Sequence, residues 1–575
     1  MPSVSDFTAL PSGASWTSAP GVPTVLTYSF VDGPMGYMLD NDLVSDRFLF
    51  SEVPFTAAQR ATTRTALDMW EGVSGLVFVE DTSGNGDIIF GNYDFSLEAV
   101  FGPNQSGYAF YPNRTVGNWY GESARIGGDI FIDTGIMANL PLVLILHEIG
   151  HALGLKHPNE GEVTLEPSYQ TERYTIMVSY LDYSVRSLGT FDGQAMAELY
   201  GDGTPHPFAP GWQSLDVDTG AMVVTQRWGE ASSEIAATSL HDDLSAGAGD
   251  DLVGGFLGDD TLRGEAGNDT LFGHIGTDHL SGGLGADYLV GGEDGDLLQG
   301  GAGDDILRGD WQTDTAPHYG ASHVAIGGAD TLEGGPGNDT LDGGEADDLL
   351  SGGAGADRLS GGDGIDTAAF ADASGRVIAD LQQDVSSQEF VRFFSAGAAE
   401  GDVFIGIENL SGGRFSDNLR GDGTDNRIEG GSGWDRLYGR AGDDRIIGGG
   451  GQDAIYGNLG ADVMTGGAPA ERDRYIYFSA AESAPGAGNR DVITDFQPGY
   501  DRIEIRRLDA DVTTGGKQGF DFVGSAAFSG TAGELRYQQV GGITLVQADL
   551  DGDAVADFEL ELSGLRTLSD DNFLI

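Results

Sequence analysis

Cysteine is absent from the 575-residue chain, which excludes disulfides, thiolate metal sites and cysteine nucleophiles. Basic residues are scarce as well: 29 Lys and Arg stand against 91 Asp and Glu, which gives a formal net charge of −62. Such a polyanion repels nucleic acids and anionic membrane surfaces, so we expect neither of them as a general partner. Only nine histidines occur in the chain, so a cluster of three would be informative.

A long apolar segment is also missing. The strongest apolar run, Leu140–Leu146, contains Pro141 and is far too short to span a bilayer, so we expect no membrane insertion. No basic residue precedes Arg47 and no apolar core follows the first residues, so a conventional N-terminal secretory signal is not expected either.

Glycine, by contrast, is abundant, with 93 residues against an average share of about 7%. The composition changes near residue 240, and the first 200 residues indicate a mixed α and β domain. Thr56 can cap a helix that ends near Gly72, and an apolar helix is predicted between residues 139 and 154. Strands are predicted at 76–80, 87–92, 107–112 and 127–133.

From Asp242 onward an aspartate recurs every nine residues, preceded by glycines and followed two positions later by an apolar side chain. The register holds within three blocks, which begin at Asp242, Asp330 and Asp417 and are separated by inserts at 310–327 and 370–409. Chance cannot keep a nine-residue register this long. We therefore interpret these residues as an internal repeat rather than a glycine-rich linker.

One apolar side chain per repeat gives a thin core, which cannot offset both the ordering entropy and the repulsion between stacked carboxylates. A hard cation such as Ca²⁺, bound by carboxylates and turn carbonyls, would remove both difficulties. The segments GGLGADYLV (282–290) and GGAGDDILR (300–308) resemble the RTX nonapeptide family, which implies a parallel β-roll with Ca²⁺ in its turns. The calcium ligands implied by this resemblance are Asp251, Asp260, Asp269, Asp278, Asp287, Asp296, Asp305, Asp330, Asp339, Asp348, Asp357, Asp435, Asp444 and Asp453, while Asn426 stands in a weaker copy.

The segment from His147 to His157 reads H-E-x-x-H-x-x-G-x-x-H. His147 and His151 share one helix face, and Gly154 lets the chain turn so that His157 can reach the same ion. Three neutral nitrogens leave a fourth position for water, which is the arrangement of a catalytic zinc site. Glu148 would then serve as the general base that activates the zinc-bound water.

This motif resembles the metzincin zinc endopeptidases, which also carry a methionine turn, and Met177 is the candidate for that turn. Together with the repeats, the resemblance narrows to the serralysin family. There the tyrosine that joins the zinc site follows the methionine by two residues, whereas Tyr180 follows Met177 by three. Tyr180 either reaches the site, as a ligand or oxyanion donor, or packs beneath the cleft. The resemblance also implies that substrate adds as a strand along residues 107–112.

The predicted fold class is an α+β metzincin zinc-protease domain, followed by an all-β RTX parallel β-roll and a C-terminal β-rich secretion region. The predicted segments are a pro-segment at 1–15, the catalytic domain at 16–205, a connecting segment at 206–240, RTX blocks at 241–310, 327–370 and 409–467, bridging strands at 371–408 and the C-terminal region at 468–575. In that last region Asp549, Asp551 and Asp553 form either a further Ca²⁺ site or an acidic turn between two strands.

The resemblance implies a secreted, monomeric endopeptidase with one catalytic Zn²⁺ and several structural Ca²⁺ ions, which cleaves extracellular proteins and leaves the cell through type I secretion machinery. An RTX adhesin or surface-layer protein with a non-catalytic N-terminal module fits the repeats equally well, but it has no need of the histidine motif. A cytoplasmic metalloprotease conflicts with the repeats, because extracellular calcium modules bind at about 10⁻⁴–10⁻³ M, far above resting cytosolic levels.

Overall fold

The residues that the computed structural model describes are 3–4, 24–30, 53–81, 87–97, 107–109, 130–134, 140–157, 164–165, 175, 177, 188, 192, 194–196, 214–218, 223–227, 232–238, 240–310, 327–382, 396–397 and 399–575. The chain divides into two compact units, Met1–Leu297 with Trp311–Ile326 and Leu298–Asp310 with Gly327–Ile575. Within the described residues, no helix has the length and apolar character needed to cross a bilayer.

The N-terminal part of the first unit is built on a five-stranded sheet with the strand order β3-β2-β4-β6-β5. Its strands are β2 (Thr24–Phe30), β3 (Leu76–Glu80), β4 (Ile88–Tyr93), β5 (Gly107–Ala109) and β6 (Ile130–Asp133). Four of them run parallel, while β5 pairs antiparallel with β6 and forms one edge of the sheet. The short elements are β1 (Ser3–Val4), which pairs with β7 (Thr164–Leu165), and the 3-10 helix η3 (Phe95–Leu97).

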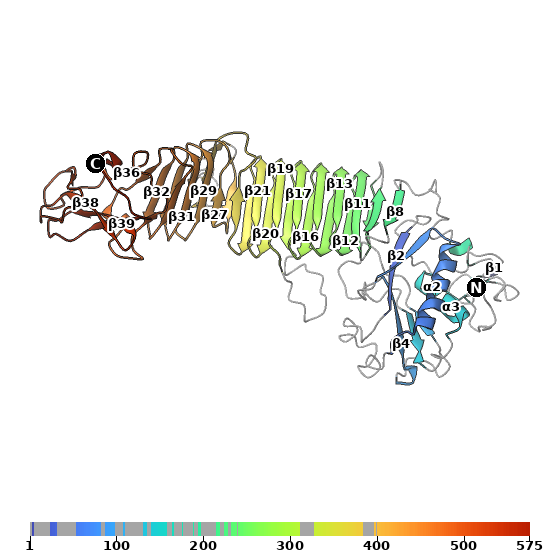
Figure 1. Ribbon diagram of the computed structural model, residues 1–575. Helices are drawn as coiled ribbons and strands as arrows, with labels where there is room; N and C mark the ends of the chain where they lie inside the picture. Colours follow the sequence, from blue (N-terminus) through green and yellow to red (C-terminus); the bar gives the residue numbers. More distant parts are fainter. Residues whose placement is uncertain are drawn as a thin grey trace. The chain divides into compact units, whose positions relative to one another are not determined.

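Two helices, α2 (Ala57–Glu71) and α3 (Leu142–Ala152), pack against each other beside this sheet (Figure 1). A capping box at Thr56 starts α2 by satisfying backbone N–H groups that have no partner within the helix. The indole Nε1 of Trp70, which is fully buried, donates to the carbonyl oxygen of Leu146 at 3.2 Å. This bond fixes α2 to the middle of α3, one residue before the histidine motif begins.

The core of this domain lies between the sheet and the two helices. Leu26 and Phe90 from the sheet, Leu67 from α2 and Ile145 and Ile149 from α3 are all at most 2% exposed and belong to one apolar cluster. Burial of side chains of this size stabilises the fold by about 1.5–3 kcal/mol each. The C-terminal half of α3 is therefore held rigidly, which is what a metal site on that helix requires.

From residue 214 onward, the described part of the first unit is a β-roll in which alternate strands enter two different sheets (Figure 1). Its first two strands pair antiparallel, and the later ones pair in parallel. Its strands are β8 (Ser214–Asp218), β9 (Val223–Arg227), β10 (Glu234–Ala236), β11 (His241–Ala248), β12 (Leu252–Leu257), β13 (Thr261–Ala266), β14 (Thr270–Ile275), β15 (His279–Leu284) and β16 (Tyr288–Glu293). Leu244 pairs in register with Leu262, and Leu262 with Leu280, so equivalent repeat positions stack at intervals of 18 residues. All three leucines are fully buried.

Glycine is required where the backbone of one turn meets an aspartate. A Cβ added to Gly264 would lie 2.3 Å from Oδ2 of Asp269, which leaves no room for any other residue. The same close contact between a glycine and the carboxylate of the aspartate five residues later recurs through the repeats, for example between Gly273 and Asp278. The glycine content of the sequence therefore has a steric cause.

The second unit continues the same construction. Its strands are β17 (Leu297–Ala302), β18 (Ile306–Asp310), β19 (Thr331–Pro336), β20 (Thr340–Glu345), β21 (Leu349–Ala354), β22 (Arg358–Asp363), β23 (Thr367–Ala369), β24 (Val377–Asp380), β25 (Ala396–Gly397), β26 (Val403–Ile405), β27 (Asn409–Ser411), β28 (Asn418–Arg420), β29 (Arg427–Gly433), β30 (Arg436–Ala441), β31 (Arg445–Gly451), β32 (Ala454–Leu459), β33 (Val463–Gly467), β34 (Arg474–Ile476), β35 (Val492–Ile493), β36 (Arg502–Glu504), β37 (Asp521–Phe522), β38 (Glu534–Val540), β39 (Ile543–Asp549), β40 (Phe558–Leu562) and β41 (Phe573–Leu574). One sheet runs β25-β24-β28-β30-β32-β34-β36-β41, and β38, β39 and β40 form an antiparallel meander near the C-terminus. The 3-10 helices η9 (Ala480–Glu482) and η10 (Asp570–Asn572) complete the unit.

The predicted fold class is confirmed: a mixed α and β domain precedes parallel repeat strands and a β-rich C-terminal region. The helix predicted from Thr56 to Gly72 is α2 with these two residues as its caps. The second predicted helix begins later than residue 139, because Pro141 occupies its N-cap. Parallel pairing also begins before the predicted boundary at 241, since β9 pairs with β11 and β10 with β12.

Candidate metal centres

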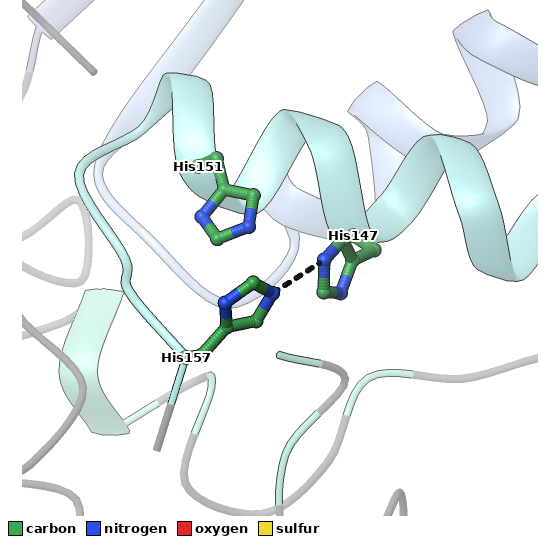
Figure 2. A group of neighbouring side chains, drawn as sticks. All are labelled: His147, His151 and His157. Carbon is green, nitrogen blue, oxygen red and sulfur yellow. Dashed lines mark hydrogen bonds between the residues drawn. The ribbon is translucent and has the colours of Figure 1, made fainter. Parts of the chain in front are cut away.

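Three histidines of the predicted zinc motif lie together at the end of α3 (Figure 2). His147 and His151 project from successive turns of the helix. Gly154 then adopts a φ of +95°, and the N–H of Leu155 donates to the Gly150 carbonyl at 2.8 Å, which closes the helix and redirects the chain. The redirected segment places His157 against the other two, with its Nε2 3.2 Å from Nε2 of His147.

The electrostatics of these imidazoles suit metal binding. One ligand nitrogen from each ring lies within 4.8 Å of the others, and Nδ1 of His151 lies 2.7 Å from the carbonyl oxygen of Leu155. That bond makes Nδ1 the protonated nitrogen and leaves Nε2 of His151 as a lone-pair donor. Burial, followed by the charges of His147 and His157, lowers the pKa of His151 to about 3, so its ring is neutral. The donor set fits a zinc ion with an open fourth position.

Glu148 follows His147 directly on α3 and is 5% exposed. Burial raises the pKa of its carboxyl to about 8. A carboxyl whose pKa is near neutrality can both accept and return a proton, which is the property of a general base.

Met177 lies buried against α3, and its backbone is held by two residues that no sequence motif identified. Oγ1 of Thr175 donates to Oδ1 of Asp192 at 2.6 Å, and the N–H of Met177 donates to Oγ1 of Thr175 at 3.0 Å. All three side chains are fully buried. A single sequence carries no signal for this contact, because Asp192 lies 17 residues beyond Thr175. Tyr180 lies outside the described residues.

The predicted substrate strand coincides in part with β5. Its three residues form the sheet edge, and Tyr108 is 37% exposed. An edge strand has unpaired backbone groups that an extended peptide can join. Residues 110–112 lie outside the described part of the chain.

The repeat aspartates form ladders along the turns of the roll. Between neighbouring repeats, Oδ1 of an aspartate accepts the backbone N–H of the aspartate 18 residues earlier, as in the 2.8 Å bond from Asp251 to Asp269 and the 2.9 Å bond from Asp435 to Asp453. Near the start of a block another N–H takes this place, such as that of Ser233 at Asp251. The second carboxylate oxygen is buried and has no hydrogen-bond donor. Among the described residues this holds for Oδ2 of Asp251, Asp260, Asp269, Asp278, Asp339, Asp348, Asp357, Asp366, Asp435, Asp444, Asp453 and Asp462.

Such oxygens are costly unless a cation binds them. Burial, together with the charges of neighbouring aspartates, raises the pKa of Asp339 and Asp435 to about 7 and that of Asp444 to about 8. Buried oxygen ligands arranged in a row are what Ca²⁺ coordinates. The chemistry of the ladder thus fits calcium in the turns. The predicted ligands Asp287, Asp296, Asp305 and Asp330 are at most 3% exposed as well.

The ladder extends to acidic residues that the nine-residue spacing did not identify. They accept the same backbone hydrogen bonds as repeat members and are Asp402, Glu408, Asp473, Asp491 and Asp501. All five are followed, two residues later, by a buried apolar or aromatic side chain. This local pattern, without the fixed spacing, could have identified them in the sequence.

Two further predictions concern individual turns. Nδ2 of Asn426 donates to the carbonyl of Glu408 at 2.8 Å, and its Oδ1 accepts the N–H of Asp422 at 2.8 Å, so this copy lacks the unpartnered carboxylate oxygen of the other copies. Near the C-terminus, the carboxylates that lie within 4.8 Å of one another belong to Asp549, Asp551 and Asp557. Asp553, the third residue of the predicted site, is not among these carboxylates and accepts the N–H of Val555 within the turn, so the choice between a Ca²⁺ site and an acidic turn stays a prediction.

Comparison with known proteins agrees with this architecture. A family model described as Matrixin matches residues 51–200, the RTX calcium-binding nonapeptide repeat matches four times between residues 254 and 368, and the Peptidase M10 serralysin C-terminal family matches residues 405–575. The fold and the histidine site thus define a metzincin-type domain joined to an RTX β-roll. The chain is serralysin-like throughout these three regions.

Similar proteins include two that are named serralysin and one that is named a metallopeptidase. The chain is 30% identical over 163 residues to Serralysin G of Dickeya chrysanthemi, covering 27% of this chain and 31% of that protein. It is 30% identical over 136 residues to Serralysin of Photorhabdus laumondii, with coverages of 21% and 27%, and over 155 residues to Metallopeptidase AprA of Pseudomonas marginalis, with coverages of 26% and 30%. The aligned segments therefore span less than a third of the length of these relatives.

Proposed function

We propose that the protein is a secreted, calcium-stabilised zinc endopeptidase that hydrolyses peptide bonds of extracellular proteins. The observation that carries this proposal is the convergence of His147, His151 and His157 beside the buried carboxyl of Glu148. The matrixin match over residues 51–200 supports it.

In this proposal the three imidazoles hold one zinc ion. When bound, zinc polarises the scissile carbonyl and lowers the pKa of a coordinated water. Glu148 takes a proton from the attacking water and returns it to the leaving amine. The edge strand β5 aligns the substrate backbone by antiparallel pairing, and Tyr180 remains a predicted oxyanion donor.

Calcium has a structural part in the proposal. Bound Ca²⁺ satisfies the buried Oδ2 atoms of the ladder and cancels the repulsion between neighbouring carboxylates. At resting cytosolic calcium the roll stays unfolded, and it folds after export. The serralysin-type region at 405–575 supports export by type I secretion machinery that reads a C-terminal signal, and we propose a monomeric extracellular enzyme.

A non-catalytic adhesin would use the same roll, but it gives no reason for three converging imidazoles. The test is Glu148→Gln, measured by hydrolysis of casein and by the zinc content of the purified protein. We expect zinc to be retained and turnover to fall at least about 100-fold, the usual contribution of a general base. Glu71→Gln is the matched control, because Glu71 is a partly buried carboxyl on α2 that accepts the N–H of Phe78. Near-normal turnover of Glu148→Gln would overturn the assignment.

A further inference from the structure

One face of the second unit carries positive charge on a chain whose formal net charge is −62. Arg436, Arg474 and Arg502 begin β30, β34 and β36 and lie in one row of the register, with Ala454 of β32 between the first two. Adjacent strands are about 4.8 Å apart, so this row spans about 14 Å across the sheet. Arg436 is exposed and makes no ion pair within the described residues.

The acidic groups of this face are already engaged. Glu504 lies 3.5 Å from Arg474 and 2.6 Å from Arg506. Asp380 is fully buried and binds Arg440 through two bonds of 2.7 and 2.8 Å. Glu504 thus partly neutralises Arg474, whereas Arg436 and Arg502 make no ion pair among the residues that the structure describes.

A stack of aromatic rings runs beside the arginine row. Tyr438 and Tyr456 are stacked with their centroids 4.3 Å apart, and Phe478 continues the stack at 5.6 Å from Tyr456. The guanidinium groups of Arg420 and Arg507 cover the two ends, at 5.5 Å from Tyr438 and 4.8 Å from Phe478. Both faces of every ring in the stack are thus occupied, and only ring edges and hydroxyl groups remain for a partner.

The phenol of Tyr456 lies close to the arginine row. The charges of Arg474 and Arg436 both act on this hydroxyl, and Tyr438 shares a hydrogen bond with it. Burial nevertheless keeps the pKa of Tyr456 high, at about 12, so it is a hydrogen-bond donor under physiological conditions. Guanidinium groups and neutral hydroxyls therefore stand side by side on this face.

We propose that this face binds a linear, uronate-bearing polysaccharide. Arg436, Arg474 and Arg502 pair with carboxylates along the polymer, since guanidinium matches a carboxylate in a two-bond geometry. The hydroxyls of Tyr438 and Tyr456 bond to sugar hydroxyls between those carboxylates. This site is independent of the histidine centre, and it would hold the protein at an acidic extracellular matrix.

Other polyanions fit less well. Single-stranded nucleic acids need free aromatic faces on which bases stack, and the faces of Tyr438, Tyr456 and Phe478 are covered. Duplex DNA carries one negative charge per roughly 1.7 Å of its axis, so the net charge of −62 repels it more strongly than it repels a polysaccharide with widely spaced carboxylates. An acidic peptide would gain backbone pairing at an edge strand, whereas β30, β32 and β34 each have a neighbour on both sides.

The test uses the calcium-loaded full chain and immobilised hyaluronan, a linear glucuronate polymer, at about 50 mM NaCl so that surface charges are weakly screened. Arg436→Gln with Arg474→Gln should weaken binding roughly tenfold or more, because a neutral amide cannot form the charge-assisted, two-bond pair with a carboxylate. The matched control is Arg427→Gln with Arg445→Gln, which removes the same charge from two exposed, adjacent positions of another sheet. We expect this control to bind as the unmodified protein does.

Tyr456→Phe should keep the stack and weaken binding several-fold, with far-UV circular dichroism unchanged. Neutral dextran should not bind. The proposal is overturned if hyaluronan does not bind, or if both arginine pairs lose affinity equally. Equal binding of duplex DNA or poly-glutamate would also overturn it, because the face would then be a general anion surface.

Discussion

The sulfur of Met177 lies directly beneath Gly150, at a distance where no side chain could stand between them. A Cβ added to Gly150 would be 2.4 Å from Sδ of Met177 and 3.3 Å from Cζ2 of Trp70. Gly150 is one of the two residues between Glu148 and His151 on α3. Close packing under the histidines thus depends on the absence of a side chain at this position.

Gly150→Ala should therefore push Met177 away from α3 and loosen the histidine site. Overpacking of a filled core costs about 1–3 kcal/mol, and disturbed support of a metal site typically lowers metal affinity roughly 10–100-fold. The measurements are the thermal midpoint and the zinc dissociation constant. Met177→Ala makes room for the new methyl group of Gly150→Ala. The double variant should therefore lose less thermal stability and less zinc affinity than the two single variants lose together. Strict additivity would contradict the contact.

The hydroxyl of Thr175 should be needed to hold the methionine turn. Thr175→Val keeps the shape of the side chain but removes both the bond to Asp192 and the acceptor for the N–H of Met177. Loss of buried hydrogen bonds of this kind costs about 1–3 kcal/mol, seen as a lower denaturation midpoint and faster zinc release. Thr175→Ser retains the hydroxyl and is the control. If Thr175→Ser and Thr175→Val lower the denaturation midpoint and speed zinc release equally, the bond to Asp192 does not support the methionine turn.

The histidine site was predictable because its ligands lie within eleven consecutive residues and their spacing alone defines a helix, a turn and a third ligand. The repeat was predictable for the same reason, since fixed local spacing encodes parallel stacking. The support of the methionine by Thr175 and Asp192 was not, because it joins residues that only tertiary packing brings together. Ladder members such as Asp473 and Asp501 were not predicted, because insertions break the nine-residue spacing before them. The backbone hydrogen bonds of the ladder nevertheless continue through these residues.

A ladder aspartate and an exposed aspartate of the same repeat block should differ in their effect on calcium binding. Asp357→Asn keeps Oδ1, which accepts the N–H of Asp339 at 2.9 Å, but replaces the buried Oδ2 with an amide nitrogen that cannot bind a cation. We expect the calcium concentration at the folding midpoint to rise several-fold, since coordination charge tunes calcium affinity. Titration of the full chain with Ca²⁺, followed by circular dichroism, measures this midpoint.

Asp363→Asn is the control for that experiment. Asp363 lies on β22, is exposed, and makes no ion pair or side-chain hydrogen bond among the described residues. Its replacement removes the same charge without removing a ligand, so the midpoint should move little. Equal shifts for Asp357→Asn and Asp363→Asn would mean that net charge, rather than coordination, controls folding of the roll.

The last prediction concerns pH in the absence of calcium. The pKa values of Asp339 and Asp435 are raised to about 7 and that of Asp444 to about 8, first by burial and then by neighbouring carboxylates, whereas the unfolded value is about 3.9. At pH values between about 4 and about 8, the calcium-free folded roll therefore binds more protons than the unfolded chain. Its stability rises as the pH falls from about 8 toward about 4 and is lost as the pH rises through the folded pKa values.

With EGTA present, the full chain should consequently show little β-structure by circular dichroism at pH 8 and gain it on acidification to pH 5. With millimolar Ca²⁺ the dependence should reverse, because ionised carboxylates bind the cation and protons compete with it. Protonation and calcium thus relieve the same repulsion by different means, and only calcium does so near neutral pH. Equal β-content at pH 8 and pH 5 in EGTA would show that the buried carboxylates do not limit folding of the roll.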